Sequence, residues 1–329
     1  MDNKATKSSS DKKGSYKVKY IIPILLLVLI FFVIIVMIIN SRKPQQMAFD
    51  KENINVKGTA FIKTSQFLIQ QAYKNWLPND LFWPTALLDN IPNFQIGELE
   101  VLRYNVRILR DNLSRMRTTD KLDPMADKAF TALANDPYKW WMPSAESKWK
   151  QAYKYLAVFY DNLLLGKTHF YPRSDNLIEL LSQYASLMGG VNTRLINAPR
   201  DIWKKGPSPA DKKIKQGNKG DELRSKAAKT HIPWYQIDDN FYYAQGVAYA
   251  LLQSFRAIQI DFADVLADKN SSMLLKQIIE DLERCDFEPL IVFNGDPDCI
   301  FANHSLNLSG FFNDARQKIN SLIMALAQG

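Results

Sequence analysis

Two adjacent aspartates and a distant histidine are the side chains of this sequence best suited to chemistry. Asp238 and Asp239 are neighbours, and His304 lies in the polar run Asn303-His304-Ser305. Two carboxylates and an imidazole could bind a metal ion or assist a hydrolysis if folding brought them together. The simpler interpretation is structural: Asp239 caps a helix, and the polar run forms a turn before the last helix.

Short motifs that accompany familiar catalytic centres are missing from the sequence. It holds three histidines, and it contains no HExxH, CxxC, GxSxG or phosphate-loop pattern. We therefore predict no catalytic residue, no metal and no cofactor.

Five tryptophans, all between positions 76 and 149, form a second group of candidates. Flat indole faces can stack on sugar rings, which makes Trp83, Trp140 and Trp141 candidates for binding a cell-wall glycan. Large aromatic residues also fill helix seams and loop junctions. We favour this packing interpretation and keep the glycan site as the alternative.

The two cysteines, Cys285 and Cys299, flank a segment with strand-like and turn-like character. Asn294-Gly295 is typical of a two-residue hairpin turn. An oxidising compartment would allow a disulfide between the cysteines. This turn, however, places Leu290 opposite Cys299, so a bridge needs a different turn geometry. We favour two free thiols and leave the disulfide open.

The residues that must position these candidates follow a helical pattern almost everywhere. Apolar residues recur at alternating spacings of three and four, which keeps one narrow stripe facing a partner helix. Four stretches have this pattern. They are Leu99, Leu102, Val106, Leu109, Leu113 and Met116; Trp149, Ala152, Leu156, Phe159 and Leu163; Phe241, Ala244, Ala248, Leu251, Phe255 and Ile258; and Phe312, Ala315, Ile319, Leu322 and Leu326.

The fold class that follows is all-α. We predict an antiparallel, coiled-coil-like helical bundle with one small hairpin or irregular excursion near 287–301. Shorter helices are expected at 61–76, 175–189 and 272–283. Capping residues mark several helix starts, namely Asp123-Pro124, Ser144, Ser174-Asp175 and Asp238-Asp239.

An uninterrupted apolar run precedes the bundle. Ile21–Ile39 contains no charge and no glycine, and as a helix it would rise about 28 Å, close to the thickness of a bilayer core. We predict an uncleaved transmembrane anchor at 21–39. Lysines are denser before the run than after it, so we expect a cytoplasmic tail at 1–20 and a periplasmic helical domain at 44–329.

The net charge of +8 is concentrated in two places. The N-terminal tail and the loop at 204–229 together carry more than the whole excess, so the remaining chain is slightly acidic. A basic face built into the fold is therefore not indicated, and we predict no nucleic acid partner. The loop at 204–229 is read as a solvated insertion, with contact to anionic lipid or cell-wall polymer as the alternative.

Several short segments, in order along the outer domain, resemble a known family. They are 77–80, 88–94, 110–115, 142–147, 170–177, 233–239, 294–295 and 302–306. The family comprises single-pass bacterial inner-membrane proteins, catalogued as domain of unknown function 2333. This resemblance implies an anchor in a Gram-negative envelope and supplies no activity. The basic loop and the two cysteines look peculiar to this member.

Two functions are compatible with the sequence. The first is a non-enzymatic envelope protein, anchored in the bacterial inner membrane through 21–39, whose periplasmic bundle acts as a scaffold or interaction module for an envelope protein partner. The alternative is a periplasmic glycan-binding or hydrolytic protein that uses the tryptophan cluster together with Asp238, Asp239 and His304.

Overall fold

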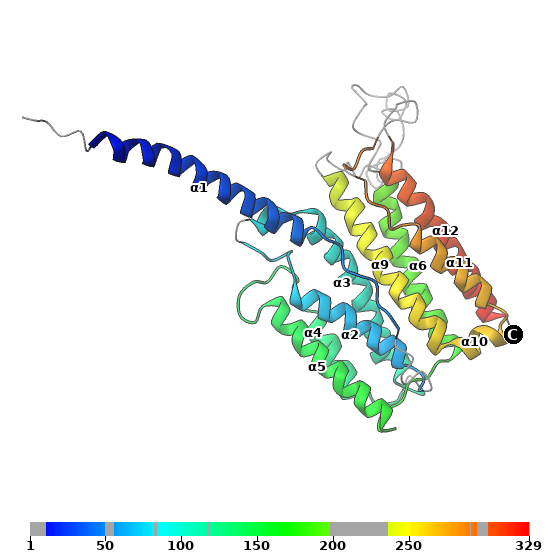
Figure 1. Ribbon diagram of the computed structural model, residues 1–329. Helices are drawn as coiled ribbons and strands as arrows, with labels where there is room; N and C mark the ends of the chain where they lie inside the picture. The colour runs from blue at the N-terminus through cyan, green and yellow to red at the C-terminus, as the bar shows by residue number, and fades with distance from the viewer. Residues whose placement is uncertain are drawn as a thin grey trace, which may run out of the picture.

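The computed structural model describes most of the chain. The described ranges are 11–49, 56–81, 84–117, 119–197, 236–289, 291–294 and 302–328, with the backbone alone at 11–20. In these ranges the backbone forms helices and one isolated β-bridge, so the all-α prediction is confirmed (Figure 1). The basic loop at 204–229, Trp83 and Cys299 lie outside the described residues.

A long N-terminal helix and a bundle make up the described fold. The N-terminal helix, α1, spans Asp11–Asn40. The elements of the bundle are α2 (Thr59–Lys74), η1 (Thr85–Leu87), α3 (Asn90–Ile108), η2 (Leu109–Leu113), α4 (Pro124–Leu133), α5 (Ala145–Leu164), α6 (Ser174–Asn197), α9 (Ile237–Asp261), α10 (Ala263–Asp268), α11 (Ser272–Glu283) and α12 (His304–Ala327).

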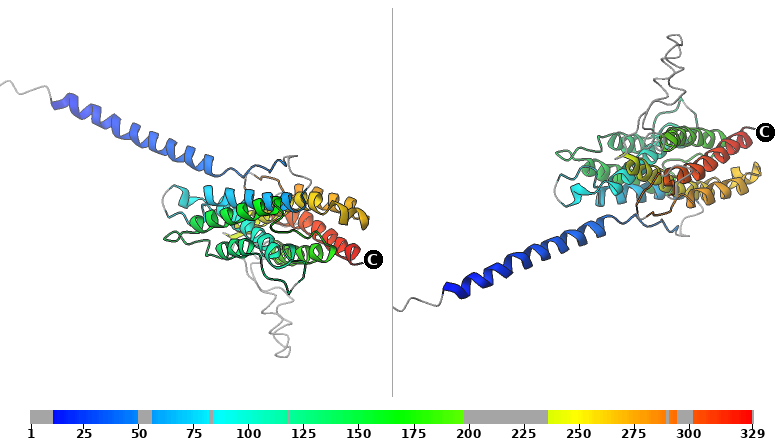
Figure 2. Two further views of the ribbon diagram at one scale, coloured as in Figure 1. Left: turned by 90° about the horizontal axis from the view of Figure 1, so that it is seen from below. Right: turned by 90° about the horizontal axis from the view of Figure 1, so that it is seen from above.

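The pair α3 and α9 forms the middle of the bundle. On one side α2 packs against α5 and α9, and α4 packs against α5. On the other side α6 packs against α12, and α11 lies between α12 and α9 (Figures 1 and 2). One continuous apolar core runs through both sides.

The predicted apolar stripes are the buried faces of four helices, with one exception. Every residue of the four series is buried except Met116, which is exposed. The reason is that the helical stretch ends at Leu113, with a π-helical turn, η2, in which the N–H of Ser114 donates to the carbonyl of Leu109 at 3.0 Å. Met116 lies beyond this end, so it does not continue the buried face.

Two of the predicted caps are present and one is not. Asp123 accepts hydrogen bonds from the backbone N–H groups of Met125 and Ala126, and Ser144 accepts one from Ser147. The predicted cap at Asp239 is wrong, because α9 already begins at Ile237 and both aspartates lie in its first turn. Carboxylates in a first turn interact favourably with the helix dipole without capping it.

The predicted two-residue turn at Asn294-Gly295 is wrong, as the pairing of the described residues beside it shows. Asn294 forms an antiparallel bridge with Asn303, and the N–H of His304 donates to the carbonyl of Phe293 at 2.8 Å. A two-residue turn at Asn294-Gly295 would instead pair residue 293 with residue 296. The observed register therefore encloses a longer loop, most of which lies outside the described residues.

An extended segment after α1 is fastened to the bundle. Lys43 forms ion pairs with Asp286 at 3.0 Å and Glu288 at 3.3 Å. The Tyr249 hydroxyl donates to the carbonyl of Gln45 at 2.7 Å, and the N–H of Met47 donates to the side chain of Gln253 at 3.1 Å. The bundle therefore holds the segment after α1 through contacts with α9 and with the residues that follow α11.

The central helices α3 and α9 approach one another at two glycines. A Cβ on Gly246 would lie 1.8 Å from the carbonyl oxygen of Phe94, and a Cβ on Gly97 would lie 2.1 Å from that of Tyr243. No side chain fits at either distance. Backbone therefore meets backbone at this crossing, and only glycine is compatible with it.

Candidate functional site

A polar cleft of about 400 Å³ lies where α3 ends in its π turn. Its walls come from the chain that follows α3 and from the start of α6. The lining residues are Asp111, Asn112, Arg115, Met116, Arg117, Arg173, Asp175, Asn176 and Glu179. Three cationic and three anionic side chains therefore share one small cleft.

The π turn and the segment before α6 hold the two walls together. The N–H of Tyr171 donates to the carbonyl of Leu113 at 2.7 Å. The side chain of the buried residue Asn176 donates to the carbonyl of Tyr171 at 2.9 Å. A π turn leaves its carbonyls less regularly paired than an α turn does, and such turns recur at functional sites. Here it lets the strand-like segment at 170–173 dock against the end of α3.

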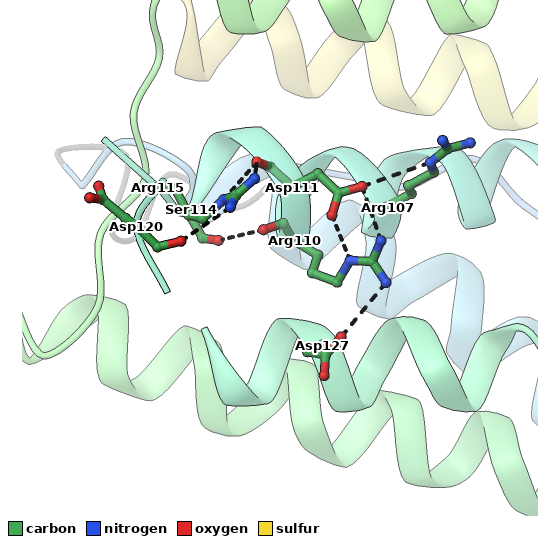
Figure 3. A network of polar contacts seen from close by, with 7 residues as sticks. All are labelled: Arg107, Arg110, Asp111, Ser114, Arg115, Asp120 and Asp127. Carbon is green, nitrogen blue, oxygen red and sulfur yellow. Dashed lines mark hydrogen bonds and ion pairs between the residues drawn. The ribbon is translucent and has the colours of Figure 1, made fainter. Parts of the chain in front are cut away.

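An ion-pair network supports the first wall (Figure 3). Arg110 donates two hydrogen bonds to the carboxylate of Asp111, at 2.7 and 3.0 Å, and this partnership raises the pKa of the guanidinium. Arg110 also lies 4.0 Å from the centre of the Phe130 ring. Paired arginine–carboxylate hydrogen bonds fix orientation as well as charge. Asp111 is thereby held at the edge of the cleft.

Arginines also fasten the other parts of the rim. Arg115 donates to the carbonyl of Asp111 at 2.8 Å and to that of Asp120 at 3.1 Å. Arg173 donates to the carbonyl of Met116 at 2.8 Å and to the carboxylate of Asp175 at 3.0 Å. Each of these arginines bridges two segments of the chain, so the charged rim is built in rather than a set of free surface side chains.

The groups that line this cleft are suited to binding a charged ligand. Its described lining contains guanidinium, carboxylate, amide and thioether groups, and neither histidine nor cysteine is among them. Charges of both signs suit a ligand that itself carries both signs, such as a polypeptide segment with acidic and basic side chains.

The structure places Asp238 and Asp239 beside the start of α3. Asn93 donates to the carboxylate of Asp239 at 2.7 Å. Partial burial raises the pKa of Asp239 to about 6, with further contributions from the charges of Asp238 and Asp89. Burial and Asp89 also raise the pKa of Asp238. The contact between Asn93 and Asp239 therefore joins the start of α3 to the start of α9.

His304 is occupied in a different contact. Its ring nitrogen Nδ1 lies 2.9 Å from the backbone N–H of Phe293, and Asn303 caps α12 by accepting from Leu306. Across the described residues, no three His, Cys, Asp or Glu side chains are arranged to hold a metal ion. Binding at Asp238, Asp239 and His304 stays a prediction, and the contacts of these residues are those of structural groups.

The tryptophans divide into two kinds. Trp76 and Trp149 are buried with ring centres 4.2 Å apart, as the packing interpretation expects. Trp140 and Trp141 are exposed in the loop between α4 and α5, with ring centres 5.3 Å apart. Neither of these two lines the polar cleft.

Cys285 is buried just after the end of α11, and burial raises the pKa of its thiol far above the usual range. A thiol that resists ionisation is a poor nucleophile. Because Cys299 lies outside the described residues, pairing between the two cysteines stays a prediction.

The comparison with protein families identifies the family of this chain. The model of a family described as an uncharacterized protein conserved in bacteria, DUF2333, matches residues 12–329. The chain belongs to this family. No curated protein and no solved structure matches it. The resemblance to DUF2333 proposed from short segments is therefore confirmed, and it extends over nearly the whole chain.

Two of the segments that carry the DUF2333 resemblance, 110–115 and 170–177, form the walls of the cleft. Sequence reasoning missed this site, because arginines that lie off the apolar stripe of a helix normally face water. The available signal was the repeated pairing of Arg with Asp and Asn in both segments. In DUF2333 proteins these two segments are the natural starting point for functional tests.

Proposed function

We propose that this protein is a non-enzymatic, single-pass membrane protein that holds a helical interaction module at the bacterial inner membrane. The observation that carries the proposal is α1. Its segment Ile21–Asn40 has a mean hydropathy of 3.6, and only 6% of this apolar stretch is buried against the rest of the chain. A core helix of a soluble bundle would be largely covered.

Contacts between α1 and the bundle favour an anchor that is kept rather than cleaved. Val33, which lies well inside the apolar run, is buried, and α1 packs against η1. A signal sequence is removed from the mature protein and needs no such contact. The excess of lysine before the run supports a cytoplasmic N-terminus and a periplasmic bundle.

The topology can be tested by cysteine labelling. The native cysteines are first replaced by alanine. Ser9→Cys then places one thiol before the anchor, and Met324→Cys places one at an exposed position of α12. We expect a membrane-impermeant maleimide to label position 324 in spheroplasts and position 9 only after lysis. The reverse pattern would place the bundle in the cytoplasm, and loss of both variants from washed membranes would contradict the anchor.

The polar cleft supports the interaction role. It presents charges of both signs on a rim that hydrogen bonds hold in place. We therefore propose that the cleft receives a charged polypeptide segment of an envelope protein partner. Such an interface gains specificity from complementary charges and requires no catalytic group in the cleft.

Site-specific crosslinking tests the cleft. A photo-crosslinking amino acid at Met116, an exposed residue of the cleft, should give a defined adduct in living cells, and Arg173→Glu should abolish it by reversing one rim charge. The matched control is the same amino acid at Met273, an equally exposed methionine on α11. Identical adducts at both positions, or an adduct that survives Arg173→Glu, would contradict the proposal.

The glycan alternative rests on the exposed pair Trp140 and Trp141. Asp238, Asp239 and His304 lie on other elements and are engaged in the contacts described above, so the proposed hydrolytic group lacks support from them. Co-sedimentation of the full-length protein with peptidoglycan, lost on replacing both tryptophans by alanine, would favour the alternative.

A further inference from the structure

Two loops at one end of the bundle expose a group of large apolar side chains. The first consists of the described residues 75–81 and 84–89 between α2 and α3, which include η1, and the second is the loop 134–144 between α4 and α5; together we call them the tip loops. A group of large apolar side chains exposed together on a protein surface marks a contact site. The exposed residues are Leu81, Leu87, Tyr138, Trp140, Trp141 and Met142.

The tip loops are joined to one another by hydrogen bonds. The indole N–H of Trp76 donates to the carbonyl of Pro137 at 2.9 Å. The side chain of Asn79 donates to Glu146 at 2.9 Å and to the carbonyl of Lys139 at 3.3 Å. The apolar side chains are therefore presented by one supported surface rather than by two independent loops.

This surface lies beside α1. Helix α1 contacts η1 in the first tip loop. Val33 is 8% exposed while its neighbour Phe32 is 59% exposed, so one face of α1 is covered at that depth. Seven residues separate Val33 from Asn40, which is about 10 Å along a helix. Figures 1 and 2 show the tip loops at the end of the bundle from which α1 extends.

From this geometry we propose that the tip loops enter the interface of the bilayer that α1 spans. The inference rests on the proposed membrane span. If Ile21–Asn40 fills the hydrocarbon core, a bundle element that packs against α1, as η1 does, lies close to the lipid head groups. The loops then meet lipid rather than water.

The composition of the second loop suits this position. Tryptophan and tyrosine concentrate at membrane–water interfaces, where the ring body lies among the acyl chains and the polar edge meets the head groups. Within Tyr138–Met142 the one charged residue is Lys139, whose ammonium favours anionic head groups. Leu87 and Met142 provide apolar side chains that gain from leaving water.

The second contact gives the bundle a fixed orientation on the membrane. A single helix would leave the bundle free to tilt about its linker, but the docked segment after α1 and the inserted tip loops restrict that motion together. The polar cleft would then face its partner at a constant height above the bilayer.

Spin-label accessibility on the full-length protein tests the proposal. The native cysteines are first replaced by alanine, and spin labels are attached at Met142→Cys and Leu87→Cys. The control label is at Met324→Cys, because Met324 is exposed and lies near the C-terminal end of α12, far from α1 (Figure 1). The protein is reconstituted into vesicles of phosphatidylethanolamine and phosphatidylglycerol. Collisions with oxygen report lipid, and collisions with a water-soluble nickel chelate report water.

We expect the labels at 142 and 87 to collide with oxygen and to be shielded from nickel, whereas the label at 324 is open to nickel. Nickel access at 142 and 87 equal to that at 324 would overturn the proposal. So would shielding from both reagents, which would indicate contact with protein instead of lipid. If the protein fails to float with the vesicles, the membrane span fails; if it floats with 142 and 87 in water, only the loop insertion fails.

Discussion

Replacing Gly246 by alanine is expected to destabilise the bundle by about 3 kcal/mol or more. The added Cβ would meet the carbonyl oxygen of Phe94 at 1.8 Å and its carbonyl carbon at 2.7 Å. These are backbone atoms, so no rotamer change relieves the clash. Helices α3 and α9 must separate instead, and the core between them opens.

The control for this variant is another helical glycine. Gly310 in α12 has nothing within 4 Å of the position that a Cβ would take. Gly310→Ala should therefore stabilise the protein by about 0.5–1 kcal/mol, because alanine loses less backbone entropy on entering a helix. Urea unfolding of the detergent-solubilised full-length protein, followed by circular dichroism, measures both variants. Equal shifts for Gly246→Ala and Gly310→Ala would refute the close crossing.

A second variant tests whether the clash acts through the crossing itself. Gly97 is the counterpart on α3, where a Cβ would lie 2.1 Å from the carbonyl oxygen of Tyr243. If Gly97→Ala and Gly246→Ala both push the same two helices apart, their effects should fall short of additivity, since the first separation makes room for the second methyl group.

The apolar spacing of the sequence determined the helices well but not the way they meet. Trp149, Phe241 and Phe312 begin stripes that are buried throughout, because a three-and-four alternation leaves only one face of a helix apolar. Gly97 and Gly246 carried no such signal. From one segment alone, a glycine inside a helix predicts only a less stable helix. Its role in the close crossing depends on a second segment about 150 positions away in the sequence.

The candidate cleft was beyond the sequence for a related reason. Arg110 and Arg115 lie off the apolar stripe of α3, and polar residues off a stripe normally face water. The π turn at Leu109–Leu113 changes this, because it turns Asp111 and Asn112 toward the segment that precedes α6. A single extra residue in one turn leaves no periodic trace that sequence analysis could follow.

The anchor was visible in the sequence, but its attachment to the bundle was not. Ile21–Ile39 suggests a tether that supplies only location. The structure adds Lys43 paired with Asp286 and Glu288, and Gln45 hydrogen-bonded to Tyr249. These contacts join residues more than 200 positions apart, so no local pattern predicts them. The segment after α1 is therefore fastened to the bundle by contacts between distant parts of the chain.

Glu98 dominates the expected pH dependence of stability. It lies in α3 with 3% of its surface exposed, and burial raises its pKa from 4.5 to about 8. The folded state then binds a proton that the unfolded state releases in this window. Stability is consequently highest below about pH 4.5 with respect to this group, and it declines as the pH rises toward 8, where the folded state also ionises.

Glu98→Gln removes that ionisation while keeping the shape of the protonated acid. Since each pKa unit corresponds to about 1.4 kcal/mol, we expect the variant to gain about 2–3 kcal/mol relative to the wild type between about pH 5 and about pH 7.5. Asp239 and Asp261, whose pKa values are both raised to about 6, contribute equally to the two proteins and cancel in the difference.

The matched control for Glu98→Gln is two residues away on the same helix. Glu100 is part-exposed and pairs with Arg103 at 2.9 Å, so Glu100→Gln should change stability by less than about 1 kcal/mol. Urea unfolding at several pH values measures all three proteins. The difference in stability between Glu98→Gln and wild type could instead stay constant across this pH range. Glu98 would then be ionised in the folded protein, and the core between α3 and α9 would contain a charge, contrary to the expectation from its burial.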